Sequence, residues 1–327
     1  MKENVKKRGM LGNFFYTVVK EYTMIFVLIA IVLILCLSTD LFLVTDNIMN
    51  LFRQTAVIGI ISIGAGIVVI GGTFDMSVGS LCTLCGCVCL ILQEHMGVAA
   101  AMLICLAIGA VVGLINGVTI TAIKGNSGDS FMVTFGMLTV LQAITLLITG
   151  GYPQGGSASD FYNFFGKGTI GGVFPVSILV FFVLTALAAV LMQKTLFGRR
   201  VYYMGSNREA ARLAGVKVGM HRIVSYVISG LCAAMAAIVL TGRINGATSK
   251  MGHNYEFDAM TAIVVGGISL SGGKGNMINM MIGVLIMATI GNGMNILGIQ
   301  TEQQYIVRGL VLIIAVLVDV IRSRKMG

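Results

Sequence analysis

Residues 98–121 read VAAAMLICLAIGAVVGLINGVTIT, a run of 24 residues without a charged side chain. As a helix, this run is about 36 Å long, enough to cross the roughly 30 Å hydrocarbon layer of a membrane. Similar apolar windows recur along the 327-residue chain, in which 57% of residues are hydrophobic and only 11% are charged. The sequence therefore predicts a membrane protein built from helices.

Ten membrane helices are predicted from these windows, some of them short or discontinuous, which gives an all-α polytopic membrane protein. They lie near residues 22–42, 55–72, 78–93, 98–121, 131–150, 174–193, 223–241, 258–271, 277–297 and 303–321. The basic N-terminal start lacks a cleavage pattern and is expected to stay attached to the first helix. Because no linker or soluble domain interrupts the spans, residues 1–327 are expected to form one membrane domain.

Positive charge sets the predicted orientation, because cytoplasmic loops retain Lys and Arg. With ten spans both termini lie on one side, and cytoplasmic termini place 17 of the 22 Lys and Arg residues inside. Outside lie only Arg53, Lys167, Arg243 and Lys250, with Arg308 inside the last span. The net charge of +9 therefore reflects topology and affinity for anionic membrane lipid, and no fold motif supports nucleic-acid binding.

Catalytic, metal and nucleotide sites are not predicted. Four cysteines within residues 82–89 lie in an apolar helix with no His at ligand spacing, which favours helix packing over metal binding. Gly273-Lys274 lacks the earlier glycine and the following Ser or Thr of a P-loop. The chain is therefore expected not to be an enzyme.

A short helix is predicted in the cytoplasmic loop of residues 194–222. Ser206 and Glu209 have the spacing of a capping box, and Gly215 suits a left-handed turn at the helix end. A rigid basic helix here suits a motor protein that pushes on it, and an ordinary connector is the alternative.

Glu209-Ala210-Ala211 followed by Gly215 resembles the EAA-x-x-x-G loop of ABC importer permeases, and three further phrases resemble those of the ribose-type permease family. They are GTFDMSVGS at 72–80, YEFDAM at 255–260 leading to VGGISLSGGKG at 265–275, and NGMNILG at 292–298. The sequence departs from the family pattern at Asp129-Ser130, where proline is common, and at Gln142, where arginine is frequent. These departures concern substrate specificity.

The resemblance implies the permease subunit of an ATP-driven importer for a monosaccharide, ribose or a related sugar, in the bacterial cytoplasmic (inner) membrane. This chain would bind no cofactor, since separate ATPase chains would bind ATP and Mg²⁺. An extracytoplasmic sugar-binding protein would dock on residues 151–173 and 242–257, and a second permease copy or a paralogue would complete the pathway. The residues implied in coupling to the ATPase are Ser206, Asn207, Glu209, Ala210, Ala211 and Gly215.

Three questions stay open at this stage. The sequence does not identify the sugar, the partner permease, or whether the ATPase is one tandem chain or two. An ion-gradient-driven secondary transporter is the alternative function, although it leaves the helix near Glu209 without a purpose.

Polar side chains in or beside the predicted spans are candidates for the substrate pathway. Asp75 is expected to be a buried anchor at a helix end rather than a substrate contact. For Asp258, a role in gating or docking is favoured as much as structural anchoring. The amide side chains suit sugar hydroxyls, with helix–helix bonding as the alternative. The full set is Asp75, Ser77, Asn116, Gln142, Asp258, Asn292 and Asn295.

Three further patterns carry structural expectations. The similar phrases at residues 68–79 and 264–273 suggest an internal repeat with interrupted helices. The Gly109-x-x-x-Gly113-x-x-x-Gly117 stripe is expected to pack against a neighbouring helix. Arg308 is interpreted as a lone snorkelling side chain, because Glu302 is poorly placed to pair with it.

Overall fold

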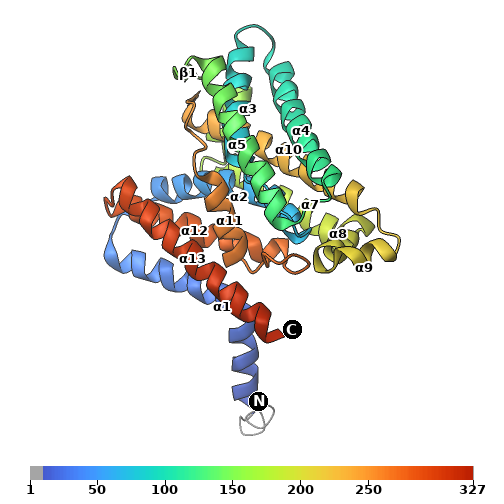
Figure 1. The fold of residues 1–327 in the computed structure, drawn as a ribbon. Helices are drawn as coiled ribbons and strands as arrows, with labels where there is room; N and C mark the ends of the chain where they lie inside the picture. Colours follow the sequence, from blue (N-terminus) through green and yellow to red (C-terminus); the bar gives the residue numbers. More distant parts are fainter. Residues whose placement is uncertain (1–9, 327) are drawn as a thin grey trace.

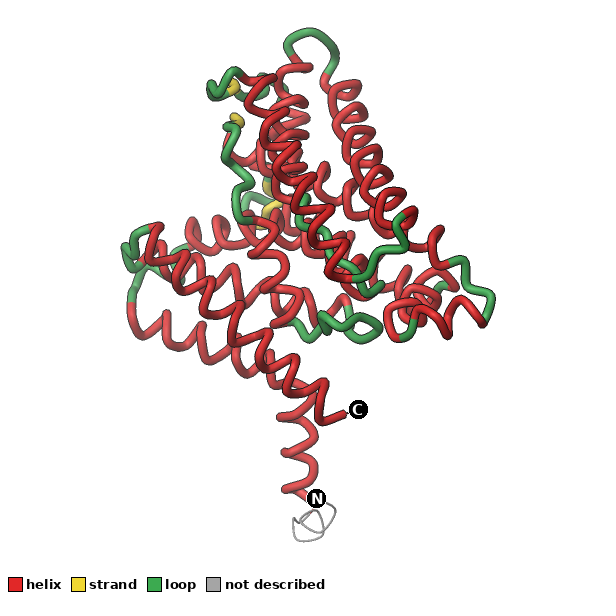
Figure 2. Tube along the Cα trace, in the orientation of Figure 1, coloured by secondary structure: helices red, strands yellow, loops and turns green. Residues whose placement is uncertain are grey.

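The computed structural model describes residues 10–326, and side chains within residues 24–321. Lys2, Lys6, Lys7 and Arg8, which entered the orientation prediction, lie outside the described residues. In the described range almost all secondary structure is helical, with four two-residue strands (Figure 2). The predicted all-α class is confirmed.

The thirteen helices of this range follow one another along the chain as shown in Figure 1. They are α1 (Met10–Ser38), α2 (Thr45–Ile70), α3 (Val78–Gln93), α4 (Val98–Ala122), α5 (Ser127–Thr149), α6 (Asp160–Lys167), α7 (Val176–Lys194), α8 (Leu196–Ser206), α9 (Arg208–Leu213), α10 (Val218–Ile244), α11 (Tyr255–Val265), α12 (Met277–Ile296) and α13 (Thr301–Met326). Seven are long and apolar enough to cross a membrane, namely α2, α4, α5, α7, α10, α12 and α13. Residues 24–38 of α1 and all of α3 form shorter apolar helices.

Helix α2 lies at the centre of the molecule. It runs between a group formed by α3, α4, α5 and α10 and a group formed by α1, α11, α12 and α13 (Figure 1). From Thr55 to Ile70 every residue of α2 is buried. This stretch carries no charge, and its small residues allow close approach: a Cβ added to Gly64 would lie 2.7 Å from the Ser229 Cα of α10.

The glycine stripe of α4 packs against α10, as predicted. A Cβ added to Gly113 would collide with the carbonyl of Tyr226, and one added to Gly117 would lie 2.8 Å from the Ile223 Cα. The two backbones therefore meet at a distance that only glycine permits.

Helices α2 and α11 end in the same way. At the end of α2, Gly72 has φ +80° and the Thr73 amide donates to the Val68 carbonyl at 3.3 Å. At the end of α11, Gly267 has φ +84° and the Ile268 amide donates to the Ile263 carbonyl at 3.1 Å. Both are Schellman turns, which need a residue that tolerates positive φ. We call α2–α3 and α11–α12 the two interrupted helices, because a short non-helical segment separates the two parts of each. Matching turns at these two interruptions are what an internal repeat predicts.

The segment 151–173, which connects the predicted spans 131–150 and 174–193, contains the α6 helix and two of the short strands. The α6 helix is capped by Ser159, whose side chain accepts from the Tyr162 amide at 3.4 Å. Strands β1 (Gln154–Gly155) and β4 (Gly246–Ala247) pair antiparallel, as do β2 (Thr169–Ile170) and β3 (Phe174–Pro175). Hydropathy does not detect such elements, because they are too short and too polar to resemble a span.

Several predicted boundaries are wrong because helices continue past their apolar windows. Helix α1 begins at Met10 rather than near 22, and α2 begins at Thr45 rather than near 55. The added first turns of α2 contain polar residues that hydropathy excludes. Conversely, α11 stops at Val265, before the predicted end at 271, because its Schellman turn intervenes.

Candidate functional site

Asp75 lies in the buried loop 71–77 that joins α2 to α3. Its Oδ1 accepts from the Ser77 hydroxyl at 2.6 Å and from the Ser77 amide at 3.1 Å. Its Oδ2 accepts from the Ser229 hydroxyl of α10 at 2.8 Å. The Asn116 amide of α4 donates to the Ser77 hydroxyl at 3.0 Å. This Asp75 cluster therefore ties the interrupted helix to both α4 and α10.

The backbone of the same loop is held by side chains of α5 and α10. The Phe74 amide donates to the Ser130 hydroxyl at 2.9 Å, and the Met76 amide donates to the Thr134 hydroxyl at 3.0 Å. The Phe74 carbonyl accepts from the Tyr226 hydroxyl at 2.6 Å. Buried backbone groups outside a helix need such partners, because hydrocarbon offers none. Ser130 belongs to the Asp129-Ser130 pair at which this sequence departs from the family's common proline, and its hydrogen bond to Phe74 is a structural role that sequence reasoning missed.

The predicted coupling segment contains two helices, α8 and α9, rather than one. Ser206 is the last residue of α8, and Asn207 caps α9 by accepting from the Ala210 amide at 2.9 Å. The predicted capping box of Ser206 and Glu209 is therefore wrong. Glu209 instead accepts from Arg212 at 3.0 Å on the exposed surface. The left-handed turn at Gly215 is confirmed, with φ +80°.

Where α8 meets α9, the chain packs on the end of α2 and on the loop between α11 and α12. A Cβ added to Gly205 would collide with the Ile70 carbonyl at the end of α2 and would lie 2.6 Å from the Gly273 amide. A Cβ added to Gly272 would lie 2.7 Å from the Gly72 Cα. Gly72, Gly205 and Gly272 therefore form a three-way backbone contact, here named the glycine junction.

Two side chains add further links around this junction. The Tyr202 hydroxyl of α8 donates to the Gly275 carbonyl at 2.9 Å, and burial raises the pKa of Tyr202, so the hydroxyl keeps its proton. The first residue of α9, Arg208, donates to the carbonyls of Lys124 at 2.8 Å and Gly125 at 2.9 Å in the turn between α4 and α5. A displacement of α9 therefore acts directly on that turn.

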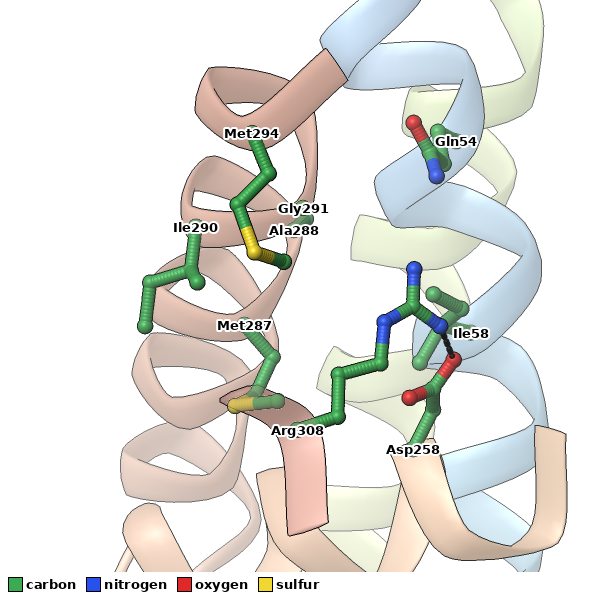
Figure 3. Close-up of a pocket in the computed structure, with 9 residues that line it drawn as sticks. All are labelled: Gln54, Ile58, Asp258, Met287, Ala288, Ile290, Gly291, Met294 and Arg308. Atoms are coloured by element: carbon green, nitrogen blue, oxygen red, sulfur yellow. Dashed lines mark hydrogen bonds and ion pairs between the residues drawn. The ribbon is translucent and has the colours of Figure 1, made fainter. Parts of the chain in front are cut away.

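Asp258 and Arg308 form an ion pair between α11 and α13, with Arg308 Nη1 donating to Asp258 Oδ2 at 2.5 Å. The interpretation of Arg308 as a lone snorkelling residue is therefore wrong. A charge within an apolar helix needs a partner. A search for a carboxylate at the same membrane depth on another span, rather than on the same helix, would have pointed to Asp258. Figure 3 shows the guanidinium group between Asp258 and the side chain of Gln54.

This ion pair lines a small pocket between α2, α11, α12 and α13. Its other walls are apolar, apart from Gln54 of α2 (Figure 3). The lining residues are Gln54, Ile58, Asp258, Met287, Ala288, Ile290, Gly291, Met294 and Arg308. The central space of about 10 Å³ holds roughly one water molecule.

The remaining candidate residues lie apart from both sites. Asn292 exchanges two hydrogen bonds with Asn47 of α2, at 2.8 and 3.1 Å. Asn295 accepts from Gln304 at 2.8 Å. Gln142 on α5 has no hydrogen bond among the described residues. The structure thus brings Asp75, Ser77 and Asn116 together and separates the other four.

Comparisons with known proteins agree with this architecture. A family model described as branched-chain amino acid transport system / permease component matches residues 47–316. The ribose import permease protein RbsC of Bacillus subtilis (strain 168) is 40% identical over 297 residues, covering 90% of each chain. The galactose/methyl galactoside import permease protein MglC of Escherichia coli (strain K12) is 35% identical, covering 95% of this chain and 97% of the relative.

A third relative, the D-allose transport system permease protein AlsC of Escherichia coli (strain K12), is 34% identical over 93% of each chain. No solved structure matches the chain. The family match spans most of the chain and includes both interrupted helices and α9. The chain belongs to the branched-chain amino acid transport system / permease component family, and it is therefore a transport subunit and a multi-pass protein of the cytoplasmic membrane.

Proposed function

We propose that this chain is the permease subunit of an ABC importer for a monosaccharide, ribose or a related sugar. The observation that carries the proposal is the α8–α9 element, whose Gly205 contacts the end of α2 and the Gly272-Gly273 segment of the loop between α11 and α12. An element that is rigid and exposed on one side, and bound to moving parts on the other, suits transmission of force. The names of the ribose, galactose and allose permeases support a sugar as the substrate.

In this proposal the chain is one membrane domain with ten spans and cytoplasmic termini. The seven long apolar helices supply seven spans, and α1, α3 and the short α11 supply the others. The start of α1 and the end of α13 lie at the same end of the molecule (Figure 1). The excess of Lys and Arg in the loops of that side supports this orientation.

Partner ATPases dock on residues 206–215, where Ser206, Asn207, Glu209, Ala210, Ala211 and Gly215 form or support the contact. They bind ATP and Mg²⁺, while this chain binds no cofactor. ATP binding draws the two ATPases together, and α9 passes the displacement to the glycine junction and, through Arg208, to the α4–α5 turn. Both interrupted helices then move together, so the pathway alternates its access.

On the outer side, a sugar-binding protein docks on residues 151–173 and 242–257. A second permease copy or a paralogue faces this chain across the pathway. Asp75, Ser77 and Asn116 hold the interrupted α2–α3 helix in register, whereas Asp258 reaches the substrate. Gln142, Asn292 and Asn295 are further candidates along the route.

A pull-down of the tagged, detergent-solubilised chain from its native membrane tests the proposal. We expect an ATPase subunit and a sugar-binding protein in the eluate, identified by mass spectrometry, with ATPase activity that the loaded binding protein stimulates. A chain that elutes alone, carries sugar in liposomes and responds to ionophores would establish a secondary transporter instead.

Replacement of Gly215 by valine should reduce sugar uptake about tenfold or more while the protein still inserts into the membrane. The space around Gly215 is open, so the effect comes from forcing a β-branched residue to φ +80°, which costs about 1–3 kcal/mol and displaces the end of α9. ATP-driven uptake in proteoliposomes measures it.

The matched control is Gly215→Asn, because asparagine tolerates the left-handed conformation. It should retain most uptake. Equal activity of the valine and asparagine variants would show that the turn does not matter for coupling.

A further inference from the structure

The pocket of Figure 3 contains polar groups whose hydrogen-bonding capacity is only partly used. Asp258 Oδ1, the Nε and Nη2 of Arg308 and the amide of Gln54 have no hydrogen-bond partner among the described residues. The three side chains come from three helices, α2, α11 and α13, and converge on one small space. Such convergence in an otherwise apolar lining is typical of a binding site.

The opening of this pocket does not suit hydrocarbon, because a charged pair is costly there. The Asp258 side chain is 6% exposed, but the Arg308 side chain is 24% exposed. A partly exposed guanidinium within an apolar span is stable only beside water or protein. The opening therefore faces an aqueous pathway or a partner chain.

Size and charge define what the pocket can hold. Its central space of about 10 Å³ suits one water molecule or one hydroxyl group, and it is far too small for a whole sugar. The ion pair cancels its own charge, so neither an anion nor a cation gains net attraction. A hydroxyl group both donates and accepts, which matches a carboxylate oxygen beside guanidinium and amide donors.

We propose that this pocket receives one hydroxyl group of the sugar as it passes, and that its opening faces the permeation pathway. Asp258 Oδ1 accepts from that hydroxyl, while Arg308 and Gln54 donate to its oxygen. The sugar ring stays outside the pocket, in the pathway. This inference rests on the proposed function and adds Gln54 and Arg308 to the residues that contact substrate.

Gln54→Leu is the sharpest test, because Gln54 has no hydrogen bond to the described residues and leucine has a similar volume. Loss of one hydrogen bond to the passing sugar should lower ribose uptake about three- to tenfold in proteoliposomes that contain the ATPase and the binding protein. Stimulation of the ATPase by the loaded binding protein should stay within about twofold of that of the unaltered protein, which would indicate that the complex still assembles. The matched control is Gln303→Leu, at an exposed position near the start of α13.

Accessibility of the same position gives an independent readout. In a Cys36→Ser background the other six native cysteines are buried, so a cysteine at Gln54 should be the thiol that a charged, membrane-impermeant thiosulfonate modifies. Ribose presented by the binding protein should slow that modification. The control is Ile306→Cys, which lies about 200° around α13 from Arg308 and should not react.

The outcomes separate the inference from the proposed function. Failure of the unaltered chain to recruit and stimulate an ATPase would overturn the proposed function itself. With a functional unaltered complex, unchanged uptake by Gln54→Leu, or a Gln54→Cys thiol that does not react or is not protected by ribose, would overturn the inference alone. Loss of ATPase stimulation together with uptake would also count against it, because it would indicate a structural role for Gln54.

Discussion

Replacement of Gly205 by valine is expected to abolish sugar uptake, with a loss of at least about a hundredfold. Even the Cβ of the new residue would overlap the Ile70 carbonyl and crowd the Gly273 amide, and both of these groups belong to backbone. Backbone atoms of packed helices cannot move aside as the end of a flexible side chain can. The α8–α9 element must then separate from the end of α2 and from the loop between α11 and α12.

Uptake by the reconstituted complex, together with the amount of ATPase that co-purifies, measures this effect. The control is Gly309→Ala on α13, where an added Cβ meets no atom within 4 Å and uptake should be unchanged. Normal uptake by Gly205→Val would show that the glycine junction opens freely and transmits no force.

Replacement of Asp75 by alanine should have the largest effect on stability. It removes the acceptor of three hydrogen bonds and leaves the buried hydroxyls of Ser77 and Ser229 without that partner. Each lost hydrogen bond contributes about 0.5–1.5 kcal/mol, and a buried hydroxyl left without a partner costs about 1–3 kcal/mol, so the total loss is about 3 kcal/mol or more. The apparent melting temperature in detergent should fall by about 5–10 °C, and uptake should fall with it.

Asp75→Asn keeps one carbonyl oxygen as an acceptor, so its melting temperature should lie between those of the unaltered protein and Asp75→Ala. Asp40→Ala is the matched control, because Asp40 is exposed and its side chain makes no hydrogen bond among the described residues. A variant Asp75→Ala with an unchanged melting temperature but lost uptake would assign Asp75 to the substrate instead of to the fold.

The sequence predicts the long membrane helices well, because twenty apolar residues have few alternatives to a span. It also predicts the turn at Gly215, because a glycine just after a helix commonly adopts the left-handed conformation that ends it. The helix cap is different. Ser206 and Asn207 are adjacent and both suit a cap, and Ser206 stays in α8 where the chain packs on Gly273, a residue 67 positions away.

The other partners that the sequence did not predict at the candidate sites are distant along the chain. Asp258 and Arg308 are 50 residues apart, and Asp75 and Ser229 are 154 apart. Spacing along one helix cannot reveal such partners. What the sequence does supply is the cost of burying each charge, and that cost predicts that a partner exists without saying where.

The β1–β4 pairing joins two surface segments that the chain separates by about 90 residues, with Gln154 opposite Ala247 and Gly155 opposite Gly246. Strand β1 lies between α5 and α6, and strand β4 lies between α10 and α11. The paired strands therefore link these four helices at the surface. A force applied to either strand is shared by all four helices, so the two segments respond together.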